Sequence, residues 1–369
     1  MTSQSRRFLT LDATRGAAAI CVMLYHFTTS GLSSATLFPN AAVAVDYFFC
    51  LSGFILSFTY EQRLRDGMTT GAFMTRRLVR LYPLYLLCIL LGVAAELVAP
   101  SLPREWGKFV TAGVMALLFL PAFVPIPVRI GTQTIDDFLF PLNPPSWSLF
   151  YELVVNWIYG VARPSTLAIL ITMAISFACY VQSVHYHFVP PGFSLGTFGG
   201  GLARSIFFFL GGVLVFRIWQ RVPPRLPAFW PILSCVVLVA ICALPYGKFT
   251  YLATALLIPI LVWSATVEPA TRAEQVTYSW LGELSYPIYV IHAPLVIVLQ
   301  PAIISPGTPA FSFPIVFTLA GAVVLAAFVL SRTWDIPVRR ALARPAERLQ
   351  LWLAGLASKP WPGRPTVKN

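Results

Sequence analysis

The chain has 369 residues, of which 57% are hydrophobic and only 11% are charged. Because a soluble domain carries about 25% charged residues, this composition excludes an ordinary soluble enzyme and predicts an integral membrane protein. The formal net charge of +12 does not indicate nucleic-acid binding, because Lys and Arg stand between apolar segments, as they do in the cytoplasmic loops of membrane proteins.

Ten apolar segments are close to the length of about 20 residues that a transmembrane helix needs. We therefore predict an all-α fold, a polytopic transmembrane helical bundle with about ten spans. The expected spans are residues 11–29, 42–60, 78–98, 146–162, 166–184, 204–219, 228–245, 250–267, 284–303 and 312–331. With these spans every strongly basic loop falls on the side of the N-terminus, so the positive-inside rule places both termini in the cytoplasm.

Segment 109–125 is a further apolar candidate, but it is short and bordered by prolines. We expect it to re-enter the membrane or to lie on the surface, where it can cover a site on the outer side. Residues 1–340 then form one membrane domain. Residues 341–369 are expected to form a cytoplasmic basic amphipathic helix followed by a flexible tail.

The first expected span carries two ionisable residues, Arg15 and His26, in the stretch LDATRGAAAICVMLYHF. Eleven helical residues make roughly three turns, so both side chains lie on one face, about 16 Å apart along the axis. The direction of the span places Arg15 near the cytoplasmic end and His26 in the outer half. Ionisable groups inside lipid are costly and are usually functional.

Three other spans place polar residues at depths similar to that of His26, namely Asp46, Glu152 and His292. Neutral imidazole can accept a proton from a hydroxyl that attacks an acyl carbon, and a carboxylate can fix the imidazole tautomer. We predict a buried site in which His26 is the general base, Asp46 orients it, and Glu152 has an acid–base or positioning role. The alternative is that His26 only bridges helices through a hydrogen bond.

The third expected span is preceded by a basic cluster, Arg76, Arg77 and Arg80, in MTRRLVRLYPLYL. Guanidinium groups bind phosphate through paired hydrogen bonds, so this cluster and Arg15 can hold a phosphorylated cofactor. Ser52, in YFFCLSGFILS, joins this cofactor-binding set because a small residue permits a ligand to approach the backbone. The alternative is that the arginines only anchor the helix to anionic lipid headgroups.

Six motifs follow one another along residues 8–340. The arginine, ten residues, histidine pattern of the first span precedes VDYFFCLSGFILS, RRLVRLYPLY, PSWSLFYEL, LGELSYPIYVIHAPL and WDIPVRR. In this order they resemble the acyltransferase 3 family of integral membrane O-acyltransferases. The resemblance implies an acyltransferase that moves an acyl group, usually acetyl, from acyl-CoA to a hydroxyl of a glycan, a lipid or an exported natural product.

The resemblance also implies roles for single residues. The histidine matching His26 is the catalytic residue, and the arginines matching Arg15, Arg77 and Arg80 are needed for activity, through the donor. Acyl-CoA, with acetyl-CoA first, is then a co-substrate, and no permanently bound cofactor is expected. No metal site is expected either, because the six cysteines show no metal-ligand spacing.

The motif around Glu152 departs from the family pattern, because Leu153 follows it where a second acidic residue is common. Any acid–base role in this motif therefore falls to Glu152 alone. Further side chains of the later motifs are assigned to substrate binding: Trp147, Tyr286, Tyr289 and His292.

Two other functions stay open at this point. A transporter or flippase would also place ionisable residues on midplane helices, although no paired broken helices or internal symmetry are visible. A receptor or scaffold would not need Arg15 and His26 on one helix face. Within the enzyme hypothesis, a small natural product such as a macrolide-type antibiotic is an alternative acceptor.

The expected partners are the lipid bilayer, acyl-CoA and a hydroxylated acceptor, not nucleic acid, and the expected location is a bacterial plasma or inner membrane.

Overall fold

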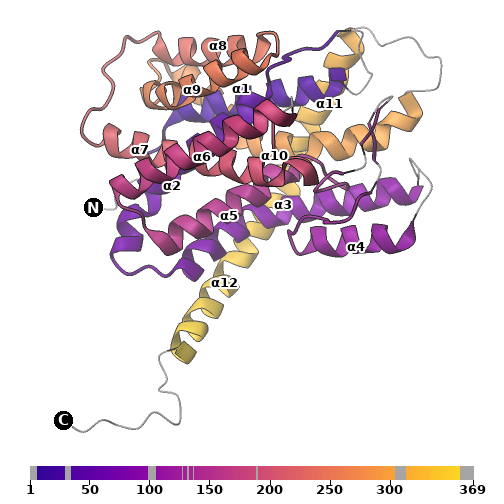
Figure 1. The fold of residues 1–369 in the computed structure, drawn as a ribbon, viewed down its shortest axis with the longest axis horizontal. Helices are drawn as coiled ribbons and strands as arrows, with labels where there is room; N and C mark the ends of the chain where they lie inside the picture. Colours follow the sequence, from indigo (N-terminus) through magenta and orange to yellow (C-terminus); the bar gives the residue numbers. More distant parts are fainter. Residues whose placement is uncertain are drawn as a thin grey trace.

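The computed structural model describes residues 6–29, 35–98, 105–126, 128–130, 133–135, 137–187, 190–303 and 313–357. Helices dominate these residues, and most of them run side by side along the horizontal direction of Figure 1. The predicted helical class is confirmed. One short antiparallel hairpin interrupts it, in which β1 (Val128–Ile130) pairs with β2 (Gln133–Ile135).

Each of the ten predicted spans corresponds to a helix. These helices are α1 (Leu9–Phe27), α2 (Ala42–Arg65), α3 (Thr70–Val98), α5 (Ser146–Ala162), α6 (Thr166–His187), α7 (Phe198–Trp219), α8 (Trp230–Ala243), α9 (Lys248–Ser264), α10 (Arg272–Ile303) and α11 (Phe313–Leu330). The starts of α7 and α10 lie well before the predicted starts at 204 and 284. A short 3₁₀ turn, η2 (Leu195–Thr197), leads into α7.

Within the described residues, five helical segments are long and apolar enough to cross a membrane. They are Ala42–Arg65, Thr70–Leu97, Thr166–His187, Leu195–Trp219 and Phe313–Ala346. Large apolar side chains are exposed on the surface of the bundle, among them Leu167, Ile175, Ile260 and Leu325. Exposed apolar surface of this kind marks contact with lipid, so the chain is a multi-pass membrane protein.

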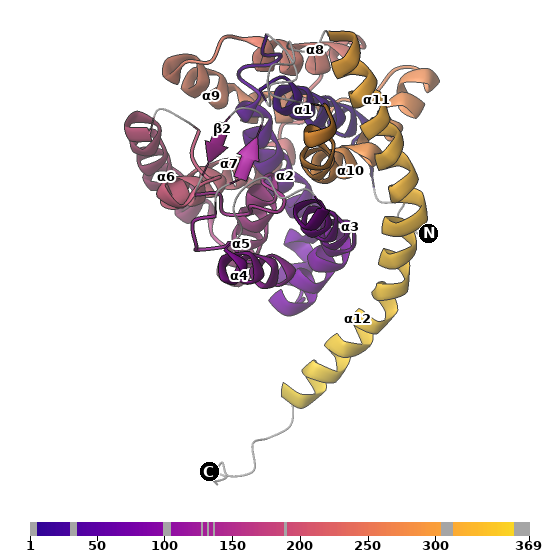
Figure 2. The same ribbon diagram turned by 90° about the vertical axis from the view of Figure 1, so that its right-hand side faces the viewer.

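Five helices form a closed ring in which each contacts the next, in the order α1, α2, α5, α3 and α10 (Figure 2). The most extensive contacts of the whole bundle join α1 to α10 and α2 to α7. Glycines permit this approach: a Cβ on Gly16 would overlap the backbone of Leu281, and one on Gly212 would overlap the carbonyl oxygen of Cys50. The ring therefore encloses side chains from all five helices.

The segment predicted not to cross the membrane, 109–125, overlaps a short helix, α4 (Trp106–Leu117), which begins three residues before it. Twelve helical residues are about 18 Å long, which is well below the ~30 Å thickness of a hydrocarbon core. Tyr85 Oη donates to the carbonyl oxygen of Ala116 at 2.6 Å, and Tyr82 Oη to that of Leu117 at 2.7 Å. The C-terminal end of α4 thus meets the middle of α3.

The chain continues from α11 through a π-helical turn, η3 (Ser331–Asp335), directly into α12 (Ile336–Ala357). The start of α12 packs against α3, and the rest extends away from the bundle (Figures 1 and 2). The expected helix after residue 340 is therefore the continuation of a longer one. The flexible tail expected after it falls on residues 358–369, outside the described residues.

Candidate active site

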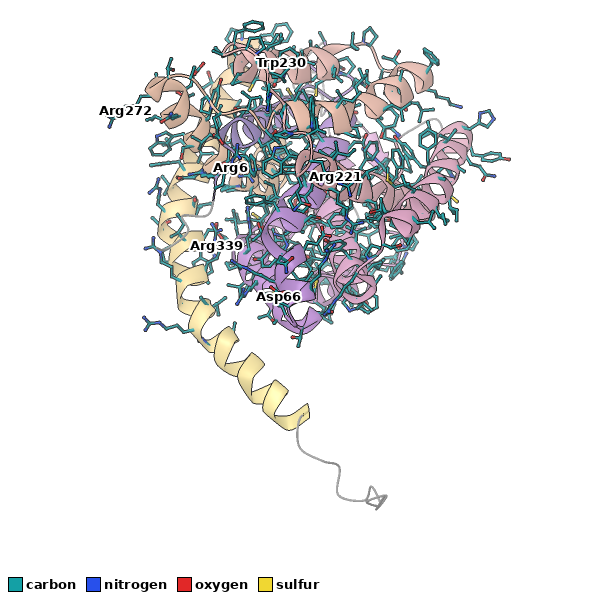
Figure 3. All side chains as sticks on the ribbon, turned by 90° about the vertical axis from the view of Figure 1, so that its left-hand side faces the viewer. Arg6, Asp66, Arg221, Trp230, Arg272 and Arg339 are labelled. Carbon is teal, nitrogen blue, oxygen red and sulfur yellow. The ribbon has the colours of Figure 1, made fainter. Side chains whose placement is uncertain are left out.

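A wide cavity opens at the end of the bundle that Figure 3 faces, where Arg6 and Arg339 are labelled. Its empty volume is about 2160 Å³, and we call it the vestibule. Among the described residues, six arginines and two acidic residues line it: Arg6, Arg7, Arg15, Arg63, Arg80 and Arg339, with Asp12 and Glu283. This excess of positive charge suits a ligand that carries several negative charges.

A second cavity of about 800 Å³, the middle cavity, lies inside the five-helix ring. It shares Arg15, Arg80 and Tyr286 with the vestibule, so the two spaces adjoin. Arg77 and Ser52 also line it, and the residues predicted to bind the cofactor therefore face one space. Arg76 is the exception.

The side chain of Arg76 is exposed, and it is not among the residues that line the vestibule or the middle cavity. One helical residue turns the chain by about 100°, so the neighbours Arg76 and Arg77 cannot share a face. Arg77 is buried, with 6% of its surface exposed. The structure thus separates Arg76 from the other three arginines of the predicted set.

Glu152 lies among the arginines. It forms an ion pair with Arg77, and Ser52 Oγ donates a hydrogen bond to Glu152 Oε1 at 2.9 Å. The expected position of Glu152 beside His26 is therefore wrong, because Glu152 lines the middle cavity and His26 lines a different one. A buried carboxylate needs a counter-charge, and Arg77 supplies it from α3.

The other two arginines of the middle cavity differ in how they are held. Arg15 Nε donates to Ser285 Oγ at 2.7 Å, and its Nη2 donates to the carbonyl oxygen of Gly282 at 2.7 Å. Arg15 also pairs with Asp12 at 3.0 Å. Arg80 has no hydrogen bond or ion pair to any other residue that the structure describes, so its guanidinium is available to a ligand.

A third cavity, the outer cavity, has an empty volume of about 1280 Å³ and is lined by His26 and Trp147. Val45 and Tyr289 line both the outer and the middle cavity, and they form the boundary between the two. Ser148 holds Tyr289 in place, because their hydroxyl oxygens lie 2.7 Å apart. The three cavities therefore follow one another from the arginine-rich vestibule to His26.

His26 pairs with His292. Nδ1 of His26 lies 2.7 Å from Nε2 of His292, and the two rings are nearly parallel, with an interplanar angle of 11° and ring centres 5.0 Å apart. His292 is completely buried, and its Nδ1 lies 3.1 Å from the carbonyl oxygen of Ile288. The sequence placed His292 with the substrate, whereas the structure places it behind His26 as its hydrogen-bond partner.

Asp46 pairs with Arg204 instead of His26. Arg204 Nε donates to Asp46 Oδ1 at 2.6 Å, and both side chains are almost completely buried. The guanidinium also donates to the carbonyl oxygens of Pro191 and Ala42, at 3.0 and 2.7 Å. The predicted role of Asp46 in orienting His26 is therefore replaced by a buried ion pair that joins α2 to α7 and to the segment before α7.

Arg204 was missed by the sequence analysis. It also borders the outer cavity, and its guanidinium lies 5.4 Å from the ring centre of Trp147. A single arginine in the apolar stretch GLARSIFFF was the available signal, because a charge inside lipid is paired.

The model of the acyltransferase 3 family, described as an acyltransferase domain, matches residues 8–332. The chain belongs to the acyltransferase 3 family. The predicted family and the predicted enzyme class, an acyltransferase, are thus confirmed. The family match begins at Phe8 and ends within η3, so it includes every residue that lines the three cavities except Arg6, Arg7, Ile336 and Arg339.

Three proteins are similar to this chain, and one of them is named an acyltransferase. "Protein 2 in picA locus" of Rhizobium radiobacter is 38% identical over 189 residues, which are 47% of this chain and 93% of the relative. "Acyltransferase MdmB" of Streptomyces mycarofaciens is 34% identical over 132 residues, or 35% of this chain and 27% of the relative. "Exopolysaccharide production protein ExoZ" of Rhizobium meliloti (strain 1021) is 27% identical over 346 residues, or 87% of this chain and 96% of the relative. No solved structure matches this acyltransferase 3 chain significantly.

Proposed function

We propose that the chain is a membrane-embedded O-acyltransferase that moves an acyl group, with acetyl as the favoured one, from acyl-CoA to a hydroxyl group. The observation that carries the proposal is the succession of cavities from the arginines of the vestibule to His26. A transporter or flippase, the other function that the sequence allowed, is not an acyltransferase. The family assignment therefore decides against it.

Acyl-CoA carries its phosphates at one end and its thioester at the other. The donor therefore enters through the vestibule, whose arginines can bind the phosphates while the thioester end points inward. The phosphates bind at the mouth, where Arg80 lines the passage into the middle cavity. The pantetheine arm then follows the middle cavity toward Tyr289. It covers the separation of about 16 Å along α1 between Arg15 and His26.

His26 acts as the general base at the outer cavity. The acceptor hydroxyl gives its proton to His26 as its oxygen attacks the thioester carbonyl carbon. The carbon–oxygen bond of the ester forms and the carbon–sulfur bond breaks. The departing CoA sulfur takes up the proton from His26, so the enzyme returns to its starting state.

The membrane topology belongs to the same proposal. Figure 3 faces the end of the bundle on which Arg6, Arg221, Arg272 and Arg339 lie. By the positive-inside rule this end faces the cytoplasm, with both termini on that side of ten spans. Acyl-CoA then enters from the cytoplasm of a bacterial cell, and the outer cavity receives the acceptor from the other side of the plasma or inner membrane.

A polysaccharide hydroxyl is the acceptor that we favour. ExoZ, which aligns over 96% of its length, is named an exopolysaccharide production protein. A hydroxyl on a lipid or on a small natural product, such as a macrolide-type antibiotic, is the alternative. Trp147, which lines the outer cavity, offers an aromatic face to a sugar or macrocycle.

Turnover of labelled acetyl-CoA by the purified protein tests the proposal. The wild type should release label from CoA to water or to an added glycan acceptor, and His26→Ala should bind acetyl-CoA but transfer at least about a hundredfold more slowly. His187→Gln is the matched control, because His187 is exposed at the end of α6. Equal turnover by the wild type and His26→Ala would refute His26 as the base.

A further inference from the structure

His26 and His292 come from the two helices that pack most extensively in the bundle, α1 and α10. The backbones of α1 and α10 approach each other closely where Gly16 meets Leu281. The 2.7 Å contact between the two imidazoles lies further along the same pair of helices. His292 is completely buried, whereas His26 is partly exposed and borders the outer cavity. One ring thus faces the reaction space and the other supports it from behind.

The hydrogen bonds of His292 determine which nitrogen carries a proton. A carbonyl oxygen only accepts hydrogen bonds, so the contact of His292 Nδ1 with the carbonyl of Ile288, at 3.1 Å, places a hydrogen on Nδ1. In neutral imidazole the other nitrogen is then an acceptor. His292 Nε2 therefore presents a lone pair to His26.

The lone pair on His292 Nε2 in turn determines which nitrogen of His26 carries a hydrogen. Since His292 Nε2 accepts, His26 Nδ1 must donate across the 2.7 Å contact. The remaining nitrogen of neutral His26, Nε2, then carries the lone pair that a general base needs. The chain from Ile288 through His292 thus selects one of two tautomers of His26.

We propose that His292 is a positioning residue, which holds His26 in the tautomer and orientation that accept the proton of the acceptor hydroxyl. This inference rests on the proposed function. When His26 Nε2 takes that proton, the imidazolium keeps its Nδ1–H bond to His292 Nε2, which becomes a charge-assisted bond and strengthens. When the CoA sulfur leaves, it takes the proton from His26 Nε2, and His292 stays neutral throughout.

Among the described residues, neither Asp46 nor Glu152 is placed to orient His26 as a carboxylate would. Asp46 is bound by Arg204, and Glu152 is bound by Arg77 in the middle cavity. A neutral acceptor behind the base also suits a buried site, because it adds no charge that the low-dielectric interior would have to stabilise. The arrangement replaces the histidine–carboxylate pair of other general-base sites.

Two substitutions separate a positioning role from a packing role. His292→Leu fills much of the same space but has no hydrogen-bond acceptor. His292→Gln can place an amide oxygen near the position of the imidazole Nε2, where it accepts the Nδ1–H of His26. A residue that only packs would tolerate leucine at least as well as glutamine, since the site is completely buried.

The experiment measures kcat and KM for acetyl-CoA in purified wild type, His26→Ala, His292→Leu, His292→Gln and the exposed control His187→Gln. We expect His292→Leu to lower kcat by about 10²- to 10⁴-fold with KM within a factor of about two, because loss of the correct tautomer affects only the proton transfer. His292→Gln should recover at least about tenfold of that loss, and His187→Gln should match the wild type.

Wild-type kcat in His292→Leu, or equal loss in His292→Gln and His292→Leu, would overturn the positioning role of His292 while His26→Ala stays inactive. If His26→Ala turns over like the wild type, the role of His26 as the base in the proposed function fails, and if the wild type does not turn over acetyl-CoA or a longer acyl-CoA, the proposed function itself fails. A circular-dichroism spectrum and the acetyl-CoA affinity of each variant identify one that has not folded. If His292→Leu has not folded, it is replaced by His292→Asn, whose shorter amide cannot reach the position of Nε2 and which should lose kcat as His292→Leu does.

Discussion

Asp46→Asn separates the structural role of Asp46 from the catalytic role that its sequence position suggests. The substitution keeps the shape of the side chain and removes its charge. Arg204 would then hold a positive charge that is 1% exposed and has lost its counter-charge, although its bonds to the carbonyl oxygens of Pro191 and Ala42 stay. We expect the protein to fold less stably.

The expected size of the loss follows from the burial of the pair. Removing one partner of a buried ion pair costs about 3–5 kcal/mol. An unfolding entropy of about 2.1 cal mol⁻¹ K⁻¹ per residue gives roughly 0.8 kcal mol⁻¹ K⁻¹ for 369 residues. The midpoint of thermal unfolding, Tm, should therefore fall by about 4–6 °C.

Intrinsic fluorescence of the detergent-purified protein, which has 10 tryptophans, reports this transition. Arg204→Gln is the partner variant, and the Tm loss of Asp46→Asn/Arg204→Gln should be smaller than the sum of the two single losses. The turnover of Asp46→Asn is measured well below its Tm, where we expect it to be within about tenfold of the wild type. An unchanged Tm together with a large loss of turnover would refute the ion-pair interpretation and return Asp46 to the chemistry of His26.

Two further predictions concern arginines four residues apart on α3. Arg80→Ala should raise KM for acyl-CoA by about tenfold or more with Tm unchanged, because a hydrogen bond to a charged group contributes about 1.5–3 kcal/mol and Arg80 has no partner among the described residues. Arg76→Ala should leave KM and kcat at their wild-type values, because the exposed Arg76 lines none of the three cavities. Steady-state kinetics over a range of acyl-CoA concentrations measures KM and kcat for both variants. Equal effects of the two substitutions would mean that this end of α3 contributes only its overall charge.

The helical class and the positions of the helices could be predicted because a lipid-exposed helix must be apolar over a fixed length. The same reasoning located Arg15 and His26 on one helix and grouped Arg77 and Arg80 with Arg15, and all three arginines line the middle cavity. Helical periodicity describes one helix at a time. It assigns a depth and a face to each residue, and these were sufficient to bring the arginines together.

The partners across helices could not be predicted in this way. Asp46, Glu152 and His292 share a similar depth with His26, and depth alone does not state how each helix is rotated in the bundle. The start of α7 was the second difficulty, because a span beginning at 204 makes Arg204 a flanking residue. The helix begins at Phe198, so Arg204 lies inside it and meets Asp46 there. A charge buried inside the membrane needs a counter-charge, so a known start of α7 at Phe198 would have predicted an acidic partner for Arg204.

The side of the membrane from which the donor enters tests the central claim, that an acyl group travels from the arginine-rich vestibule to His26. Labelled acetyl-CoA, which does not cross a sealed membrane, is added to inside-out and to right-side-out vesicles that contain the protein, before and after permeabilisation. The account predicts turnover in sealed inside-out vesicles, and in right-side-out vesicles only after permeabilisation. Turnover at the full rate in sealed right-side-out vesicles would contradict it, because the donor would then reach His26 from the other side.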